Sequence, residues 1–318
     1  MSAEGSVEDE ALISCNSPSL LEVGLSGNKV NEETDEDLSK KSDGSPPRPH
    51  HLMTTKELQL YWIKEKYGDL PEKLLFQIKS ARIAEDFLSK FVMYQIVIIK
   101  TGSFDQKRVS IERRYSDFER LHRNLLKDFN NEMEDIVFPK KILIGNLNEE
   151  MINKRMIALK EYLEELYAIR CVRNSKKYID FFINPELEES YNCIRGGQYV
   201  RATQLLQQIL GLQEKLAKDH PTTKVPTLCA LVVCHKDMDQ FQEAYEVGLQ
   251  ALELIQKHPR HKYYAALLDI LITIAYKLGK EFQFLREKLE VQERMGSRGF
   301  EGEMTLKEIV VQEWVHAE

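Results

Sequence analysis

The stretch ERRYSDFERLH, residues 112–122, places two adjacent arginines and a tyrosine where the residue pattern changes. Before it, apolar and charged residues alternate, as they do in a β-strand with one buried face. After it, apolar residues recur at helical spacing, which predicts a helix from Tyr115 to about Phe129. The stretch therefore predicts a strand that passes directly into a helix, with the two cations at the junction.

Three runs rich in β-branched and aromatic residues predict three strands. They are EKLLFQIKSARI (72–83), SKFVMYQIVIIKTG (89–102) and QKRVSIERR (106–114). Thr101, Gly102, Ser103 and Asp105 are turn-forming residues between the second and third runs. An antiparallel three-stranded meander is the simplest topology for this order.

Helical patterns follow the strands. Beyond the first helix they cover residues 148–168 and 175–184, and the latter segment is predicted to end before Pro185. The segment NNEMEDIVFPKKILIGNL (130–147) is expected to be a loop. Strands followed by helices indicate an α+β domain.

Residues 1–52 differ in composition from the rest of the chain. Residues 1–50 hold eleven acidic and four basic residues, which accounts for the whole formal charge of −7. With few aromatic residues, this tail is predicted to be disordered. In residues 53–71, a Thr54-Thr55-Lys56-Glu57 capping box and LQLYWIKEKYG predict a short amphipathic helix and a linker.

The composition also excludes several classes of protein. No apolar run approaches the roughly 18 residues of a membrane span, and the acidic start lacks the features of a secretory signal, so we expect a cytosolic protein. The net charge disfavours nucleic-acid binding. The five cysteines form no CxxC motif, and neither a metal-ligand cluster nor an enzyme signature is found, so no cofactor and no catalysis are expected.

Residues 187–318 show a helical pattern with an irregular repeat. Three segments align so that Tyr199, Phe241 and Phe282 correspond, with Ala202 and Ala244 three residues after the first two aromatics. An aromatic followed by a small residue resembles the second helix of a tetratricopeptide repeat. An unrelated helical bundle is the alternative.

Basic residues at three element boundaries suggest an anion site. Arg113 and Arg114 precede the first helix, Lys140 and Lys141 follow Pro139 in the loop, and Lys154 with Arg155 lie near the start of the next helix. Guanidinium groups bind phosphate bidentately and lysine adds a point charge. Apolar residues directly after the loop lysines would suit a membrane interface; they are Ile142, Leu143, Ile144 and Leu147.

The RRYSDFERLH stretch, the FPKK loop and KRMIALKEYL together resemble the phox-homology (PX) domain of the sorting nexin family, over about residues 72–186. The helical remainder, with YAIRCVRNS and GQYVRA, resembles the PX-associated B domain found in that family. One departure is the loop, which has Pro139 but lacks the second proline that the family usually places before the lysine.

The resemblance implies a site for phosphatidylinositol 3-phosphate. It assigns Arg114 to the 3-phosphate, Tyr115 to the inositol ring, Lys141 to the 1-phosphate and Arg155 to the ring hydroxyls. Lys140, Ile142, Leu143 and Ile144 become possible membrane contacts. Arg113 is expected to face solvent or to pair with an acid such as Glu112.

The resemblance further implies a non-catalytic adaptor in the cytoplasm and on early endosome membranes. The PX domain would bind phosphoinositide. The helical domain would bind the cytoplasmic tail of a transmembrane cargo or adhesion receptor. The alternative is a helical-repeat scaffold whose PX domain serves mainly protein-protein binding.

Overall fold

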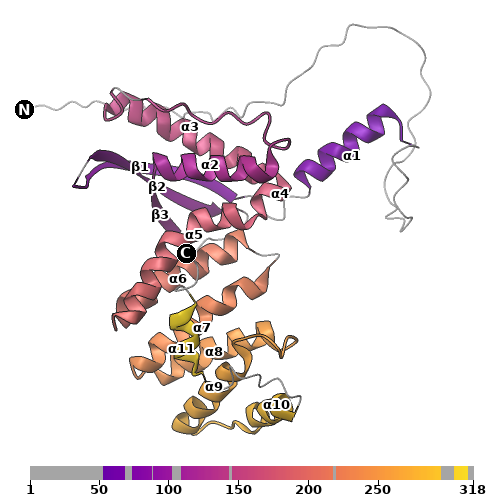
Figure 1. The fold of residues 1–318 in the computed structure, drawn as a ribbon, viewed down its shortest axis with the longest axis vertical. Helices are drawn as coiled ribbons and strands as arrows, with labels where there is room; N and C mark the ends of the chain where they lie inside the picture. Colours follow the sequence, from indigo (N-terminus) through magenta and orange to yellow (C-terminus); the bar gives the residue numbers. More distant parts are fainter. Residues whose placement is uncertain are drawn as a thin grey trace, which may run out of the picture. The chain divides into compact units, whose positions relative to one another are not determined.

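The first half of the structure is built around a three-stranded antiparallel sheet (Figure 1), as predicted. The computed structural model describes residues 53–68, 74–87, 89–101, 109–142, 145–217, 220–294 and 304–313. The strands are β1 (Leu74–Glu85), β2 (Lys90–Lys100) and β3 (Val109–Arg114), in the order β1-β2-β3. The predicted disordered tail (1–52) and most of the predicted turn after Thr101 lie outside the described residues.

Helices α2 (Tyr115–Phe129) and α3 (Glu149–Ala168) pack against this sheet. Alternate side chains of β2 enter the core, because successive residues of a strand point to opposite faces; they are Val92, Tyr94, Ile96 and Ile98. The register between β1 and β2 shifts between Ile78 and Ser80, a β-bulge that accommodates one extra residue on β1. The α+β arrangement is as the sequence predicted.

Helix α1 (Thr55–Tyr67) begins at the predicted capping box, in which Thr54 accepts from the backbone of Glu57. Its predicted amphipathic character is wrong, since none of its residues is buried. Five of the six residues of LQLYWI are apolar or aromatic, so these side chains lie around the helix and do not form one stripe. Leu60, Trp62 and Ile63 are exposed as a result.

The predicted helix end before Pro185 is also wrong. After the short α4 (Arg170–Arg173), helix α5 runs without interruption from Lys176 to Arg195 and contains Pro185. Proline lacks an N–H, so the carbonyl four residues earlier, that of Phe181, loses its helical donor. A buried carbonyl without a donor is unfavourable, and a tertiary contact supplies the replacement.

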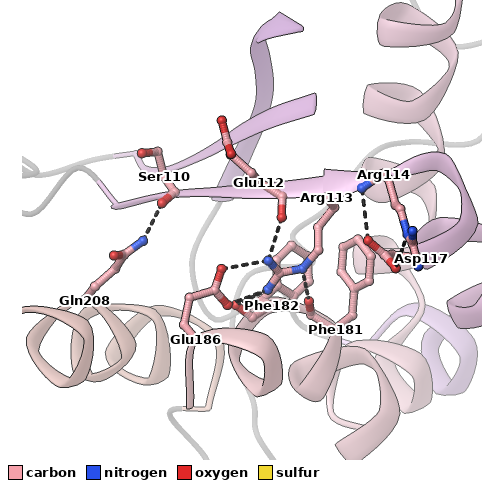
Figure 2. Close-up of polar contacts among 9 residues, drawn as sticks. All are labelled: Ser110, Glu112, Arg113, Arg114, Asp117, Phe181, Phe182, Glu186 and Gln208. Atoms are coloured by element: carbon pink, nitrogen blue, oxygen red, sulfur yellow. Dashed lines mark hydrogen bonds and ion pairs between the residues drawn. The ribbon is translucent and has the colours of Figure 1, made fainter. Parts of the chain in front are cut away.

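That replacement is Arg113 (Figure 2). Its Nε donates to the Phe181 carbonyl at 2.7 Å, and Nη2 donates to the Phe182 carbonyl at 3.0 Å. Both terminal nitrogens also bind the Glu186 carboxylate at 2.7 Å in a bidentate pair. Arg113 is only 2% exposed, so the sequence-based expectation of a solvent-facing residue is wrong.

The alternative expectation, that Arg113 pairs with an acid, is confirmed, but the acid is Glu186 and not the example Glu112. Glu112 gives Arg113 only its backbone carbonyl, at 2.8 Å, while its carboxylate pairs with Arg82 of β1. In a strand, adjacent side chains point to opposite faces, so Glu112 and Arg113 cannot readily meet. Arg113 instead reaches α5, which follows it by about seventy residues.

Helix α5 belongs to both halves of the described chain. Tyr178, Phe181 and Phe182 are buried in its first part, and Tyr191 and Ile194 are buried in its last part. The sheet also contacts the next helix, α6 (Tyr199–Leu216), because the Ser110 carbonyl of β3 accepts from Gln208 and the Ile98 carbonyl accepts from Lys215 at 2.9 Å. The predicted domain boundary, between residues 186 and 187, therefore falls inside α5.

The second half is a stack of helices, tetratricopeptide-like as predicted. After α6 come a 3₁₀ helix (Pro221–Lys224), α7 (Val225–Asp237), α8 (Phe241–Ile255), α9 (Tyr264–Leu278), α10 (Gln283–Arg294) and α11 (Leu306–Gln312). Each α-helix from α5 to α9 packs against the next α-helix in sequence. None of the helices in the described ranges combines the length and hydropathy that a membrane span requires.

The aligned aromatics mark equivalent places in this stack. Tyr199 and Phe241 are the first residues of α6 and α8, and Phe282 directly precedes α10. Ala202 and Ala244 are fully buried, and at Gly248 the helices come so close that a Cβ would lie 2.6 Å from Leu271 Cδ2. Small residues therefore set the spacing between paired helices, as the repeat pattern predicted.

We expect Arg113→Ala to lower the free energy of unfolding by about 3–5 kcal/mol, because it leaves the largely buried Glu186 carboxylate and two carbonyls of α5 without their partner. Urea denaturation followed by circular dichroism measures this. The matched control is Arg82→Ala, which removes a bidentate pair with Glu112 from the exposed face of the same sheet. A control as damaging as Arg113→Ala would contradict the assignment.

Pro185→Ala tests the specific role of Arg113 as a substitute donor. With an N–H restored at residue 185, the Phe181 carbonyl regains a helical donor. Arg113→Ala should then cost less in the Pro185→Ala background than in the native chain. Equal costs in both backgrounds would show that the carbonyl contact contributes nothing.

Candidate functional site

Arg114 points away from the core that Arg113 enters, because the two residues follow one another in β3. Its side chain is 45% exposed, and its Nε lies 3.6 Å from Asp117 Oδ1. The guanidinium also lies 5.6 Å from the ring centre of Phe91 on β2. The Arg114 backbone N–H donates to Asp117 Oδ2 at 3.0 Å, which fixes the junction between strand and helix.

Tyr115, the first residue of α2, ties this junction to the loop at 130–147. Its hydroxyl donates to the Pro139 carbonyl at 2.7 Å, two residues before Lys141. Burial is the main cause that raises the pKa of Tyr115 above its usual value, so the hydroxyl stays protonated at neutral pH. The tyrosine therefore holds the loop, a role that the sequence did not indicate.

Arg155 of α3 completes the cluster and is only 8% exposed. Its guanidinium carbon lies 4.9 Å from the centre of the Tyr115 ring, a cation–π contact. One terminal nitrogen lies 3.4 Å from the Tyr94 hydroxyl, a long hydrogen bond. A guanidinium carries five N–H donors, and the contact with Tyr94 uses one of those of Arg155.

The loop is attached to the domain by a cluster of four aromatic rings, which we call the loop anchor. Phe138 comes from the loop itself, and the other three rings are those of Tyr115, His122 and Tyr162. Phe138 stacks on His122 at 4.8 Å and meets Tyr162 and Tyr115 at 5.1 and 5.5 Å. His122 Nδ1 lies 3.1 Å from the Tyr162 hydroxyl. Because Lys140 and Lys141 follow Phe138 by only two and three residues, the loop anchor restricts where their backbone can lie.

The loop lysines themselves extend into solvent. Lys140 and Lys141 are exposed and have no ion pair with any described residue, while Ile142 is half-buried. Leu143 and Ile144, the other predicted membrane contacts, lie outside the described residues. Lys154 pairs with Glu150 at 2.7 Å on its own helix and takes no part in the cluster.

The structure thus brings Arg114, Tyr115 and Arg155 together at one end of the sheet and attaches Lys141 to the same place through Pro139. Phosphate chemistry suits this set, since it contains two guanidinium groups and an ammonium group. Within the described ranges, no group of three His, Cys, Asp or Glu side chains is placed to hold a metal ion.

Several residues near the site were not singled out from the sequence. Phe91 lies under Arg114, Tyr94 contacts Arg155, and Asp117 competes for Arg114. Phe87 projects fully exposed from the hairpin between β1 and β2, at the end of the sheet where Met93 pairs with Arg114. An aromatic flanked by Asp86 and Ser89 at a hairpin tip was the only sequence signal for it.

His122 gives the loop anchor a dependence on pH. Burial lowers the pKa of His122 below its usual 6.5, so the unfolded chain takes up the proton more readily than the folded chain. Its contribution to stability is complete above that value and is lost as the pH falls below it. From about pH 7.5 to about pH 5.5 we expect the native chain to lose more free energy of unfolding than His122→Phe does.

Chemical denaturation at each pH measures this difference. His220→Phe, at an exposed histidine, is the control and should retain the native slope. Parallel pH profiles for native and His122→Phe chains would contradict the prediction.

The chain is similar to known proteins over most of its length. Residues 101–185 match the PX domain family. The chain is 52% identical over 277 residues to sorting nexin-20 of Bos taurus, which covers 86% of each protein, and 48% identical over 271 residues to that of Rattus norvegicus, which covers 85% of each. It is 32% identical over 277 residues to sorting nexin-21 of Mus musculus, covering 86% of this chain and 76% of that protein.

The alignments with these relatives cover most of this chain and most of each relative. Sorting nexins are in general non-catalytic, phosphoinositide-binding peripheral proteins of endosomal membranes. The chain belongs to the sorting nexin family and contains a PX domain.

Proposed function

We propose that the PX domain binds phosphatidylinositol 3-phosphate at the end of the sheet where β3 meets α2. Arg114 binds the 3-phosphate, Lys141 the 1-phosphate and Arg155 the ring hydroxyls, while Tyr115 contacts the inositol ring. The observation that carries this proposal is the joining of three separate elements around Tyr115, through Arg155 at 4.9 Å and Pro139 at 2.7 Å.

The contrast between the two arginines supports Arg114 as the phosphate ligand. Arg113 is committed to two carbonyls of α5 and one carboxylate, whereas Arg114 is half exposed and has a single described acidic neighbour at 3.6 Å. That neighbour, Asp117, also pairs with Arg120 at 2.6 Å. A phosphate that carries two charges can therefore displace Asp117 from Arg114 while Arg120 keeps the carboxylate paired.

Tyr115 and Arg155 act together in this proposal. The arginine lies over the tyrosine ring, so the ring fixes where the guanidinium donors are presented. The low exposure of Arg155 reduces competition from water and strengthens its hydrogen bonds to a bound hydroxyl.

The proposed membrane contact uses the loop and the hairpin. Lys140 lies beside the site, and Ile142, Leu143 and Ile144 follow it in the sequence. Phe87 adds an exposed aromatic ring at the same end of the sheet. Aliphatic and aromatic groups next to cations favour the interface of an anionic membrane.

We further propose that the protein is a non-catalytic adaptor, cytoplasmic and bound to the cytoplasmic side of early endosomes. Its helical half would hold the cytoplasmic tail of a transmembrane cargo or adhesion receptor. Lipid and protein contacts together raise residence through effective concentration. In the alternative, a scaffold whose PX domain mainly binds proteins, lipid binding would be absent.

Arg114→Ala should reduce binding to vesicles containing phosphatidylinositol 3-phosphate at least about tenfold, since hydrogen bonds to charged groups contribute about 1.5–3 kcal/mol each. Vesicle sedimentation over a range of lipid concentrations measures the loss. The thermal midpoint should change little, because the side chain is half exposed.

Arg82→Ala serves again as the matched control, because it removes an exposed, ion-paired arginine from the same sheet. It should bind vesicles like the native chain. Undiminished binding by folded Arg114→Ala would exclude this residue as the phosphate ligand, and absence of binding by the native chain would favour the scaffold alternative.

Ile142→Asp separates membrane contact from headgroup recognition. We expect weaker vesicle binding, because a carboxylate opposes entry into an anionic interface. Affinity for soluble inositol 1,3-bisphosphate, measured by calorimetry, should stay within about twofold of the native value, since only the membrane contact changes. Equal losses in both assays would place Ile142 in the headgroup site or in the fold.

A further inference from the structure

The short helix α11 lies across the helical stack and does not extend it. It contacts α5, α7 and α9, the first helices of the successive pairs, although α10 precedes it in sequence. Figure 1 shows α11 in yellow beside α7. We call the surface that α5, α7 and α9 present to α11 the α11 groove. One segment of chain thus touches all three helical pairs.

The apolar part of this contact is small. Leu306 and Val310, four residues apart on one face of α11, are 2% and 0% exposed. The other described side chains of α11 are partly or fully exposed. A helix of seven residues is not stable alone in water, so α11 owes its helical form to the groove and to its Thr305 capping box.

Polar contacts fix α11 at both ends. Near its start, Lys307 Nζ lies 2.5 Å from Asp237 Oδ2 and 2.8 Å from the Tyr199 hydroxyl. After its end, Glu313 accepts from the Tyr263 hydroxyl at 2.6 Å and pairs with Lys262 at 2.5 Å. The groove therefore has an acidic group at one end and a basic group at the other, and each meets its opposite charge.

The acidic end is adapted to a cation. Burial alone would raise the pKa of Asp237, but hydrogen bonds from Lys307 and Tyr199 outweigh it and hold the pKa below its ordinary value. The Asp237 side chain is 17% exposed, whereas that of Lys307 is 44% exposed. The helical stack thus contributes the buried partner, and α11 contributes the accessible one.

These contacts are those of a bound peptide. A few anchors, two aliphatic and two charged, hold a short helix in a groove built by other elements. Among the described residues of α11, only Leu306 and Val310 are buried. We therefore expect α11 to stay in the groove mainly because the chain connects it to the helical stack. A tethered segment acts at millimolar effective concentration, which a separate segment must overcome.

We propose that the α11 groove is a binding site for a short helical peptide of a partner protein, and that α11 is its built-in competitor. The partner segment would carry two aliphatic residues four apart, a basic residue directly after the first and an acidic residue three after the second. This deepens the protein-binding role proposed for the helical half and does not depend on lipid binding.

The test uses a fluorescein-labelled peptide of residues 304–318 and the chain ended at residue 303. Fluorescence anisotropy should show saturable binding to the shortened chain. Binding to the full chain should be at least about 100-fold weaker, because its own α11 competes at high effective concentration. A folded shortened chain that binds no peptide would overturn the proposal.

Peptide variants make the test specific. Val310→Asp in the peptide removes a buried anchor and should abolish binding, while Gln312→Asp, at an exposed position, should not. The Lys307→Asp peptide should bind the native groove more weakly than the native peptide does. It should bind the Asp237→Lys groove more tightly than it binds the native groove. Indifference to Val310→Asp, or no effect of the charge exchange, would contradict the assigned orientation.

A second variant covers the case in which the shortened chain does not fold. A protease site placed between residues 298 and 299 of the full chain allows α11 to be cut free after folding. Labelled peptide should then exchange into the cleaved chain and not into the intact chain. If cleaved α11 stays bound and no peptide exchanges, α11 is a permanent part of the core and the proposal is wrong. Vesicle binding should be the same before and after cleavage, so failure here is distinct from failure of the lipid site.

Discussion

The contact between Arg113 and the middle of α5 is the constraint on which the rest of the structure depends. Pro185 deprives the Phe181 carbonyl of its helical donor, and Arg113 supplies another from the end of β3. With Glu186 paired to the same guanidinium, the helix continues to Arg195 and packs against α6. Arg113 therefore links the sheet to α5, beside the contacts that Gln208 and Lys215 of α6 make with the carbonyls of Ser110 and Ile98.

The same strand end divides its residues between structure and ligand. Strand alternation sends Arg113 inward to α5 and Arg114 outward to solvent, and the next residue begins α2. Because Arg113 is rigidly held, the position of Arg114 is fixed without restricting its own donors. Tyr115 then fastens the loop of Lys141 to the same point. A site assembled from three elements gains its precision from this single anchored junction.

In the helical half, too, a small number of residues determines how the elements pack. Buried alanines and Gly248 bring the helices close, and the resulting stack presents one groove that α11 crosses. Lys307 and Glu313 meet opposite charges at its two ends. A lipid contact at one half and an exchangeable peptide contact at the other would allow the two ligands to reinforce one another on a membrane.

The sequence alone determined the elements whose signal is local. Alternation predicted the strands, helical spacing predicted α2 and α3, and the aligned aromatics predicted equivalent positions in the helical repeat, because each pattern lies within one element. The residues of the candidate site were chosen from a motif, and their roles remain proposals. Tertiary structure decided the partner of Arg113, the passage of α5 through Pro185 and the seat of α11. Those depend on groups separated by about fifty residues or more, and the periodicity of a sequence carries no information about which distant groups will meet.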